Sequence, residues 1–274
     1  MALPNVVRFS RGFAGLYNSA RPHLDVATLS AAINCARGGP AHSPDLVVDI
    51  GAGTGLSTLP WAGHARRVTG VEPSDEMRTV AETARHQSNA DNVEFVAGTS
   101  TATGLPAACA DIVTIAQALH WMAPLDATFA EVSRILKPGG VFVAYDADWP
   151  PLCGREAESA YDAFCARAEA LEASLLASPG VIKENKAAHA SRMRASGRFR
   201  HVRDIAVHQQ GAGSAADLVD LALSQGTVQA VLAVGATHAD LGVSELSAAA
   251  ARCFGGNDVM SKWMFTYRLR IGIV

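Results

Sequence analysis

The sequence contains few cysteines, few aromatic residues and little excess of charge of either sign. Its five cysteines are odd in number and widely spaced, with no CxxC pair and no histidine at metal-ligand spacing. The net charge of −3 gives no global electrostatic reason to bind nucleic acid. We therefore expect reduced, partly buried thiols and no metal centre. A nucleic-acid partner is not expected from the net charge, although a local basic patch keeps that question open.

The sequence also lacks the long apolar runs that span membranes. No run reaches the ~18 apolar residues that a membrane helix needs. The N-terminus shows no basic segment followed by an apolar region and a cleavage site. We expect a cytoplasmic protein without a membrane partner. Its 274 residues, of which 49% are hydrophobic, can bury a sizeable core as one large domain or as a main domain with an insertion.

The most informative stretch is VVDIGAGTG at residues 47–55. A short apolar run, typical of a buried strand, is followed by glycines at every second position, Gly51, Gly53 and Gly55. Without Cβ atoms these residues can adopt positive φ and let a ligand approach the backbone. Backbone amides after the turn suit a carboxylate or phosphate. A glycine turn alone fits a nucleotide, a dinucleotide or a tight loop, so the surrounding residues must decide.

Strand-like apolar segments alternate with amphipathic helical patterns over residues 47–146, which predicts right-handed βαβ units and a parallel sheet covered on both faces. The expected strands cover residues 47–50, 67–71, 93–97, 111–117, 141–146, 199–207 and 265–273. The last alternates strictly and places Arg268 and Arg270 on a solvated face, so we expect it to be antiparallel and near the sheet edge. The prediction is an α/β fold with a doubly wound, Rossmann-like, mostly parallel seven-stranded sheet whose last strand is antiparallel.

The chain is expected to divide into three functional parts. Residues 1–40 carry two amphipathic helices, the first with Phe9 and Phe13 on its apolar face, and are predicted to form an N-terminal lid. Residues 41–149 and 199–274 are predicted to form the ligand-binding core. Residues 150–198 are predicted to be a helical cap insertion over the substrate, with helices at about 214–255 contributing to it.

Polar residues gather where the predicted parallel strands end, which is where open α/β sheets bind ligands. Glu72 ends the second strand, where a carboxylate can accept hydrogen bonds from both hydroxyls of a ribose. Thr99 and Ser100 follow the third strand, and the segment from Gln117 to Trp121 follows the fourth. These features predict one crevice beside the glycine turn. Glu72 alone does not separate this from a nicotinamide-cofactor site.

Four motifs in this order resemble the class I S-adenosylmethionine-dependent methyltransferases. They are VVDIGAGTG, VTGVEPS at residues 68–74, DIVTIAQALHW at residues 111–121 and LKPGG at residues 136–140. The chain most resembles the type 11 small-molecule branch, which includes trans-aconitate-methyltransferase-like proteins. The resemblance is strong over residues 9–148 and weaker beyond them. It implies S-adenosyl-L-methionine as cofactor and S-adenosyl-L-homocysteine as product, with transfer of the methyl group to a small-molecule acceptor by in-line SN2 displacement.

The resemblance also implies roles for particular residues. Glu72, followed by Pro73, would bind the ribose, and Gln117 would lie beside the sulfonium. The methionine end would be held by residues of the turn, namely Asp49, Gly51, Ala52 and Gly53. Thr99 and Ser100 would lie by the adenine, where many relatives carry an acidic residue instead. Tyr17 and Arg21, which precedes Pro22, would close over the cofactor as a lid.

His120 is the candidate catalytic residue. A sulfonium methyl is already electrophilic, so the protein mainly aligns the reactants, and a base is needed only where the nucleophile must lose a proton. An imidazole suits that role, and His120 follows the fourth strand. We interpret it as a base or substrate-orienting group, with a histidine that lines the cleft without chemical duty as the alternative. Trp121 would form an apolar wall, and His23 is a weaker candidate for lining the substrate.

Three other functions stay open at this point. A methyltransferase acting on RNA or protein and a non-catalytic cofactor-binding protein fit the same motifs. An NAD(P)-dependent oxidoreductase fits less well, because the turn reads GxGxG rather than GxGxxG and no Tyr/Lys pair stands at helical spacing. A basic cluster is expected to be a solvated face rather than a site for an acidic substrate or RNA. Its members are Lys183, Lys186, Arg192, Arg194, Arg198, Arg200, His201 and Arg203.

Overall fold

A computed structural model describes residues 13–38, 43–176 and 183–274 of the chain. Phe9, expected on the first amphipathic helix, lies outside the described residues. The chain divides into two compact units. The sheet unit comprises His23–Ala147, Ile182–Val207 and Tyr267–Val274, and the helical unit comprises Met1–Pro22, Asp148–Val181 and His208–Thr266.

Seven strands form one sheet in the order β3-β2-β1-β4-β5-β7-β6. They are β1 (Leu46–Ile50), β2 (Arg67–Val71), β3 (Val93–Val96), β4 (Ala110–Ala116), β5 (Leu136–Ala147), β6 (His201–Gly213) and β7 (Ser261–Ile273). Strands β1 to β5 pair in parallel, whereas β7 pairs antiparallel with β5. The predicted α/β class, the mostly parallel sheet and the antiparallel last strand are confirmed. Strand order reverses at β1 and β4, which places a ligand crevice at their carboxyl ends.

The sheet unit carries four α-helices and three 3₁₀ turns in its described part. They are α2 (Val26–Arg37), η2 (Leu59–Gly63), α3 (Asp75–Gln87), η3 (Leu119–Trp121), α4 (Leu125–Ile135), η4 (Lys186–Ala188) and α6 (His189–Ala195). Helix α3 begins as its sequence predicts, with the Ser74 side chain accepting a hydrogen bond from the Met77 amide at 3.3 Å. The segment after the glycine turn forms only the short η2, with Pro60 in its first turn.

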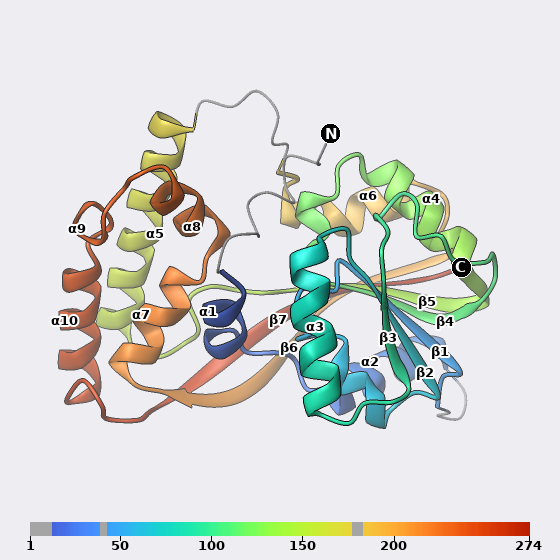
Figure 1. Ribbon diagram of the computed structural model, residues 1–274, viewed down its shortest axis with the longest axis horizontal. Coiled ribbons are helices and arrows are strands. Elements are labelled where there is room, and N and C mark those ends of the chain that lie inside the picture. Colours follow the sequence, from blue (N-terminus) through green and yellow to red (C-terminus); the bar gives the residue numbers. More distant parts are fainter. Residues whose placement is uncertain (1–12, 39–42, 177–182) are drawn as a thin grey trace. The chain divides into compact units, whose positions relative to one another are not determined.

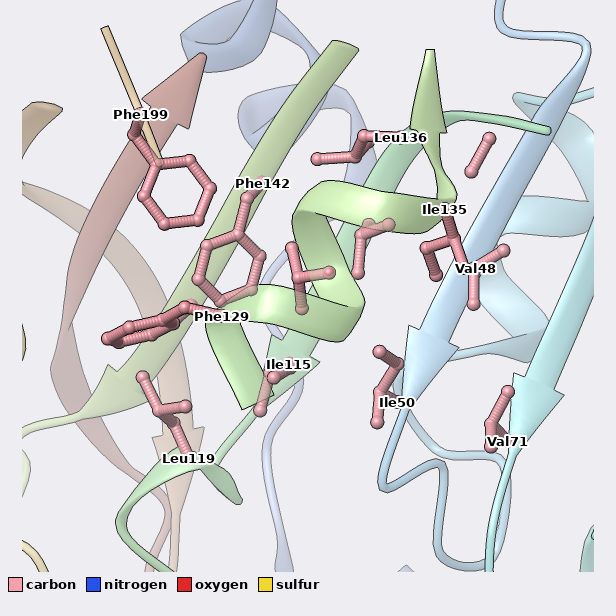
Figure 2. Close-up of a cluster of buried hydrophobic side chains, with 14 of the residues drawn as sticks. Val48, Ile50, Val71, Ile115, Leu119, Phe129, Ile135, Leu136, Phe142 and Phe199 are labelled. Carbon is pink, nitrogen blue, oxygen red and sulfur yellow. The ribbon is translucent and has the colours of Figure 1, made fainter. Parts of the chain in front are cut away.

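A buried aromatic group fastens α4 to the sheet. Phe129 of α4, Phe142 of β5 and Phe199 have ring centroids 5.5 to 6.2 Å apart, and Figure 2 shows these rings facing one another beside Leu119 and Ile115. Met193 of α6 belongs to the same core cluster. In Figure 1, α4 and α6 lie on one side of the sheet and α2 on the other. The strand ends that carry polar residues are therefore held by a well-packed layer.

The helical unit contains α1 (Phe13–Ala20), α5 (Arg155–Leu175), α7 (Ala215–Leu223), α8 (Gly226–Ala233), α9 (His238–Leu241) and α10 (Val243–Phe254). Helix α5 contacts α8, α9 and α10. The apolar face of α5 is buried at Tyr161, Phe164 and Ala168, but Leu175 at its end is 49% exposed. Ser214 and Asp217 form a capping box at the start of α7. No helix within the described residues is long and apolar enough to cross a membrane.

The compact units and the expected functional parts have different boundaries. Residues 182–207 group with the sheet, whereas residues 208–266 group with α5 in the helical unit. The sequence predicts an insertion at residues 150–198 and a core that resumes at residue 199. The roles of lid and substrate cap stay predictions.

One expectation about β7 is wrong. Strict alternation predicted that Arg270 faces solvent with Arg268, but Arg270 is only 5% exposed and the strand is buried on both faces from Leu269 to Ile273. The Arg270 guanidinium donates a hydrogen bond to Asp146 of β5 at 3.0 Å. A buried partner on the neighbouring strand thus overrides the surface placement that alternation predicts.

Truncation of Phe129 tests the aromatic packing. Replacing the fully buried Phe129 by alanine should lower the free energy of unfolding by about 3–5 kcal/mol, because apolar contacts are lost and a cavity forms. Chemical denaturation measures this change. Asp91→Ala, an exposed substitution in the same unit, should change stability by less than about 0.5 kcal/mol. Equal midpoints for the two variants would refute this packing account.

Candidate functional site

The glycine turn after β1 has the backbone that its sequence predicts. Gly51, Gly53 and Gly55 have φ values of 75°, 55° and 85°. A Cβ atom on Gly51 would come within 2.6 Å of Met122 Cε, and one on Gly55 within 2.9 Å of a Phe95 ring carbon. A Cβ atom on Gly53 would meet nothing within 4 Å. The outer two glycines thus permit close packing, while Gly53 faces open space.

Glu72 closes the turn from the end of β2. Its Oε2 accepts a hydrogen bond from the Gly53 amide at 2.9 Å, and its Oε1 accepts one from the Ser74 amide at 2.9 Å. Burial raises the pKa of Glu72 in spite of these two amides. Each carboxylate oxygen keeps a further lone pair, so hydroxyl groups of a ligand can still donate to it. The expected neighbours, the glycine turn and the carboxylate, are in direct contact.

Asp49 lies completely buried beneath the same turn. Its Oδ2 accepts hydrogen bonds from the Ser57 and Thr58 hydroxyls, and its Oδ1 accepts one from Thr114, each at 2.7 Å. Burial raises the pKa of Asp49, and the three hydroxyl donors counteract this. In this structure Asp49 ties the turn to β4 and to the segment before η2. Its expected role at the methionine end stays a prediction.

These hydrogen bonds predict a large loss of stability for Asp49→Ala. The exposed fraction of both Thr58 and Thr114 is 0%. In the variant their buried hydroxyl groups would lose their acceptor, and each unsatisfied hydroxyl would cost about 1–3 kcal/mol of stability. Ser57→Ala is the matched control, since it removes one donor from a half-buried residue and should cost about 1 kcal/mol. Thermal unfolding without any ligand measures both. Equal stability of the two variants would contradict the anchoring role.

The other predicted cofactor residues lie at strand ends or in the turn. Ala52 of the turn is buried and Pro73 is half-buried. The Thr99 backbone exchanges hydrogen bonds with Ala102 at 3.0 and 3.2 Å, and Ser100 Oγ accepts one from Thr128 at 3.0 Å.

Gln117 stands out in its backbone conformation. It has a φ of 55°, which is uncommon for a residue with a side chain. Its backbone N–H donates a hydrogen bond to the Tyr145 carbonyl at 2.8 Å. Such conformations cluster at functional sites. The cofactor roles of Gln117, Thr99 and Ser100 stay predictions.

His120 and Trp121 form η3 directly after β4. Their rings are tilted against each other with centroids 4.9 Å apart, and Lys183 Nζ lies 5.4 Å from the Trp121 ring centre. His120 is 5% exposed, and the Glu184 amide donates to its carbonyl at 2.8 Å. Burial lowers the pKa of His120, so its imidazole is neutral near pH 7 and can accept a proton.

The predicted lid residues are found in different units. In the helical unit, Arg21 donates hydrogen bonds to the Ser224 hydroxyl at 2.8 Å and to the Gln225 side chain at 3.0 Å. Its guanidinium also lies 5.3 Å from the Tyr17 ring and 4.9 Å from the Trp149 ring. Arg21 thus anchors α1 to the segment between α7 and α8, a contact that the sequence did not reveal. The roles of Tyr17 and Arg21 over a cofactor stay predictions.

His23 is exposed and belongs to the sheet unit. It lines a pocket of about 490 Å³ together with Gly55, Leu59 and Asn92. His120 and Trp121 are not among the residues that line this pocket. The role of His23 in lining a substrate stays a prediction.

The basic cluster is an exposed surface at Arg192, Arg194, Arg198, Arg200, His201 and Arg203. Lys186 differs from these residues, because its ammonium lies 3.0 Å from Asp146 Oδ1. The sequence reading missed this buried carboxylate. Asp146 lies at the carboxyl end of β5, as Glu72 lies at the carboxyl end of β2. The rule that open α/β sheets bind ligands at the carboxyl ends of their strands therefore indicates Asp146 as well as Glu72.

Comparison with known proteins agrees with this geometry. Residues 48–144 match the family model of the methyltransferase domain. The matched residues begin within β1 and contain the glycine turn, Glu72 and His120. The chain is 33% identical to the ubiquinone/menaquinone biosynthesis C-methyltransferase UbiE of Rubrivivax gelatinosus over 38% of this chain and 40% of that protein. The malonyl-[acyl-carrier protein] O-methyltransferase of Pectobacterium atrosepticum is 36% identical over 37% of this chain and 38% of that protein.

The similarity in fold extends further than the similarity in sequence. A solved structure from Anaeromyxobacter dehalogenans, assigned to the type II methyltransferases, covers 92% of this chain and 97% of that one with a TM-score of 0.67 and 22% identity. At that identity the likeness concerns the fold alone. The chain spans between 36% and 55% of the length of the first curated relatives that it matches.

Proposed function

We propose that this protein is an S-adenosylmethionine-dependent methyltransferase that acts on a small-molecule acceptor and forms S-adenosylhomocysteine. The observation that carries the proposal is the contact between Gly53 and Glu72, at the switch point of the sheet, with open space over Gly53. A matching methyltransferase domain spans the same residues. We further propose the type 11 small-molecule branch, which includes trans-aconitate-methyltransferase-like proteins.

The residues at this place fit the proposed cofactor. The carboxylate of Glu72 would accept the ribose hydroxyls while it keeps its bonds to the turn, with Pro73 beside it. The open backbone of Gly53, with Gly51 and Ala52, would receive the methionine end, and Asp49 would serve that end by holding the turn. Tyr17, Arg21, Thr99, Ser100 and Gln117 would complete the site as the sequence predicts.

S-Adenosylmethionine, when bound, supplies a methyl group that is already electrophilic on its sulfonium sulfur. The protein then has to orient the acceptor, exclude water and, for acceptors that carry a proton, remove it. His120 is neutral at pH 7 because burial lowers its pKa, so it can take that proton. Trp121, in contact with His120, would provide an apolar wall for the acceptor.

Two named relatives support a small-molecule acceptor without defining it. One is named as a C-methyltransferase of ubiquinone and menaquinone biosynthesis, the other as an O-methyltransferase of malonyl-[acyl-carrier protein]. Carbon and oxygen acceptors thus occur among the named relatives of this chain. The acceptor atom is therefore set by residues outside the shared motifs.

A pair of glycine substitutions tests the proposed site. Gly53→Ala adds a methyl group into the open space, at a φ of 55° that costs about 1–2 kcal/mol of stability. We expect its affinity for S-adenosylhomocysteine, measured by calorimetry, to fall at least about tenfold. Gly104→Ala is the matched control, because Gly104 also has a positive φ, 74°, and open space. It should lose similar stability and keep wild-type affinity.

The outcome separates the competing functions. Binding of NAD by the wild-type protein, without binding of S-adenosylhomocysteine, would replace this proposal by an oxidoreductase. Equal affinities in Gly53→Ala and Gly104→Ala would place the cofactor elsewhere. Methyl transfer from labelled S-adenosylmethionine to tRNA, and not to a panel of small acids, phenols and amines, would contradict the small-molecule acceptor.

A further inference from the structure

A cluster of charged and titratable side chains lies directly behind His120 in the sheet unit. Asp146, at the end of β5, is its centre. Lys186 Nζ lies 3.0 Å from Asp146 Oδ1, and Arg270 Nη1 lies 3.0 Å from Asp146 Oδ2. The nearer ring nitrogens of His120 and His189 lie 3.4 and 3.9 Å from the same carboxylate. Five elements, η3, β5, η4, α6 and β7, thus contribute to one cluster.

This cluster is costly to bury. The Asp146 side chain is 4% exposed and that of Arg270 is 6% exposed. Packed apolar residues at such positions are often as stabilising as an ion pair, so stability alone does not explain the cluster. Burial would raise the pKa of Asp146, but His120, whose Nδ1 lies 3.4 Å from the carboxylate, and the charge of Lys186 lower it well below its usual range. Asp146 is therefore an anion throughout the neutral range.

The two imidazoles differ in what they can do. Burial lowers the pKa of His189 to about 4, so His189 is neutral and adds no positive charge to the cluster. The buried Nδ1 of His120 lies 3.4 Å from Asp146 Oδ1 and makes no hydrogen bond to any other described residue. A carboxylate beside a neutral imidazole favours a proton on the facing nitrogen, which leaves the lone pair on the other one.

Resting on the proposed function, we propose that Asp146 is a positioning residue for methyl transfer. It keeps Nδ1 of His120 protonated, so that Nε2 is the nitrogen that accepts the acceptor's proton, while Lys186 and Arg270 keep the carboxylate ionised and in place. The bond from the acceptor atom to its proton breaks as the bond from the proton to Nε2 forms, and the freed electron pair stays on the acceptor. The imidazolium, stabilised by Asp146, later returns the proton to water.

Two other readings of the cluster fit the structure less well. The part of the chain that the structure describes contains no group of His, Cys, Asp and Glu arranged to hold a metal ion. The two cations at 3.0 Å also occupy the positions around Asp146 that a metal would need. A purely structural role would not require an imidazole at His120, which is a neutral ring beside a carboxylate already held by Lys186 and Arg270.

The pKa of the His120 imidazole depends on all the charged groups around it. Asp146 favours the imidazolium, whereas Lys186 and Lys183 oppose it. Arg270 and neutral His189 face the same carboxylate, and Asp204 Oδ1 lies 3.9 Å from Arg270 Nε. In Asp146→Asn, Arg270, which lies 3.0 Å from Oδ2, would hold the amide oxygen, and the amide NH₂ would take the place of Oδ1, the atom that faces His120. That group donates to Nδ1, so the ring proton would move to Nε2.

Nitrogen NMR of histidine-labelled full-length protein tests the proposal without knowledge of the acceptor. The His120 signals are identified by their loss in His120→Gln. The wild type should show the Nδ1–H tautomer. Asp146→Asn should show the Nε2–H tautomer and a titration midpoint lower by about one pH unit or more. Asp126→Asn removes an exposed carboxylate from the same unit and should leave both features unchanged.

Failure of this proposal is distinguishable from failure of the proposed function. A wild-type Nε2–H tautomer, or an unchanged tautomer and midpoint in Asp146→Asn, would overturn the positioning role even if S-adenosylhomocysteine binds. Absence of S-adenosylhomocysteine binding in the wild type would overturn the function even if the tautomer is as expected. Should Asp146→Asn fail to fold, the wild-type tautomer and one further variant decide. Lys186→Met, at a side chain that is 34% exposed, then provides a second variant whose midpoint should rise.

Discussion

The hydrogen bond from the Gly53 amide to Glu72 is the interaction on which the proposed site depends. It joins the turn after β1 to the end of β2 at 2.9 Å and fixes where the carboxylate points. Asp49 holds the same turn from below through three hydroxyl groups. The turn is therefore braced on both sides, while Gly53 itself faces open space. Such bracing lets a backbone with positive φ persist as a rigid binding surface.

Much of the fold could be predicted because local patterns and tertiary packing agree. The strand before Gly51, the cap at Ser74 and the capping box at Ser214 each follow from a few neighbouring residues. The position of Glu72 beside the turn followed from strand ends meeting at one edge of a parallel sheet. These features need no knowledge of distant contacts, which is why the sequence sufficed for them.

Arg270 and Asp146 illustrate what could not be predicted. The alternating pattern predicts Arg270 in solvent. The strand β7 is instead buried on both faces from Leu269 to Ile273, and the Arg270 guanidinium pairs with Asp146. Asp146 and Arg270 are 124 residues apart in the chain, and only the antiparallel pairing of β5 with β7 brings them together. Likewise, the contacts of Arg21 with Ser224 and Gln225 depend on how α1 packs against α7. Periodicity carries no information on such partners.

A crystal structure of the protein with S-adenosylhomocysteine tests the central claim most directly. The account predicts ribose hydroxyls within hydrogen-bond distance of the Glu72 carboxylate and the ligand's amino-acid portion against the backbone of Gly53. The contact between Gly53 and Glu72 should persist, since the carboxylate has lone pairs for both partners. A ligand bound elsewhere, with Glu72 still facing only the Gly53 and Ser74 amides, would contradict the account.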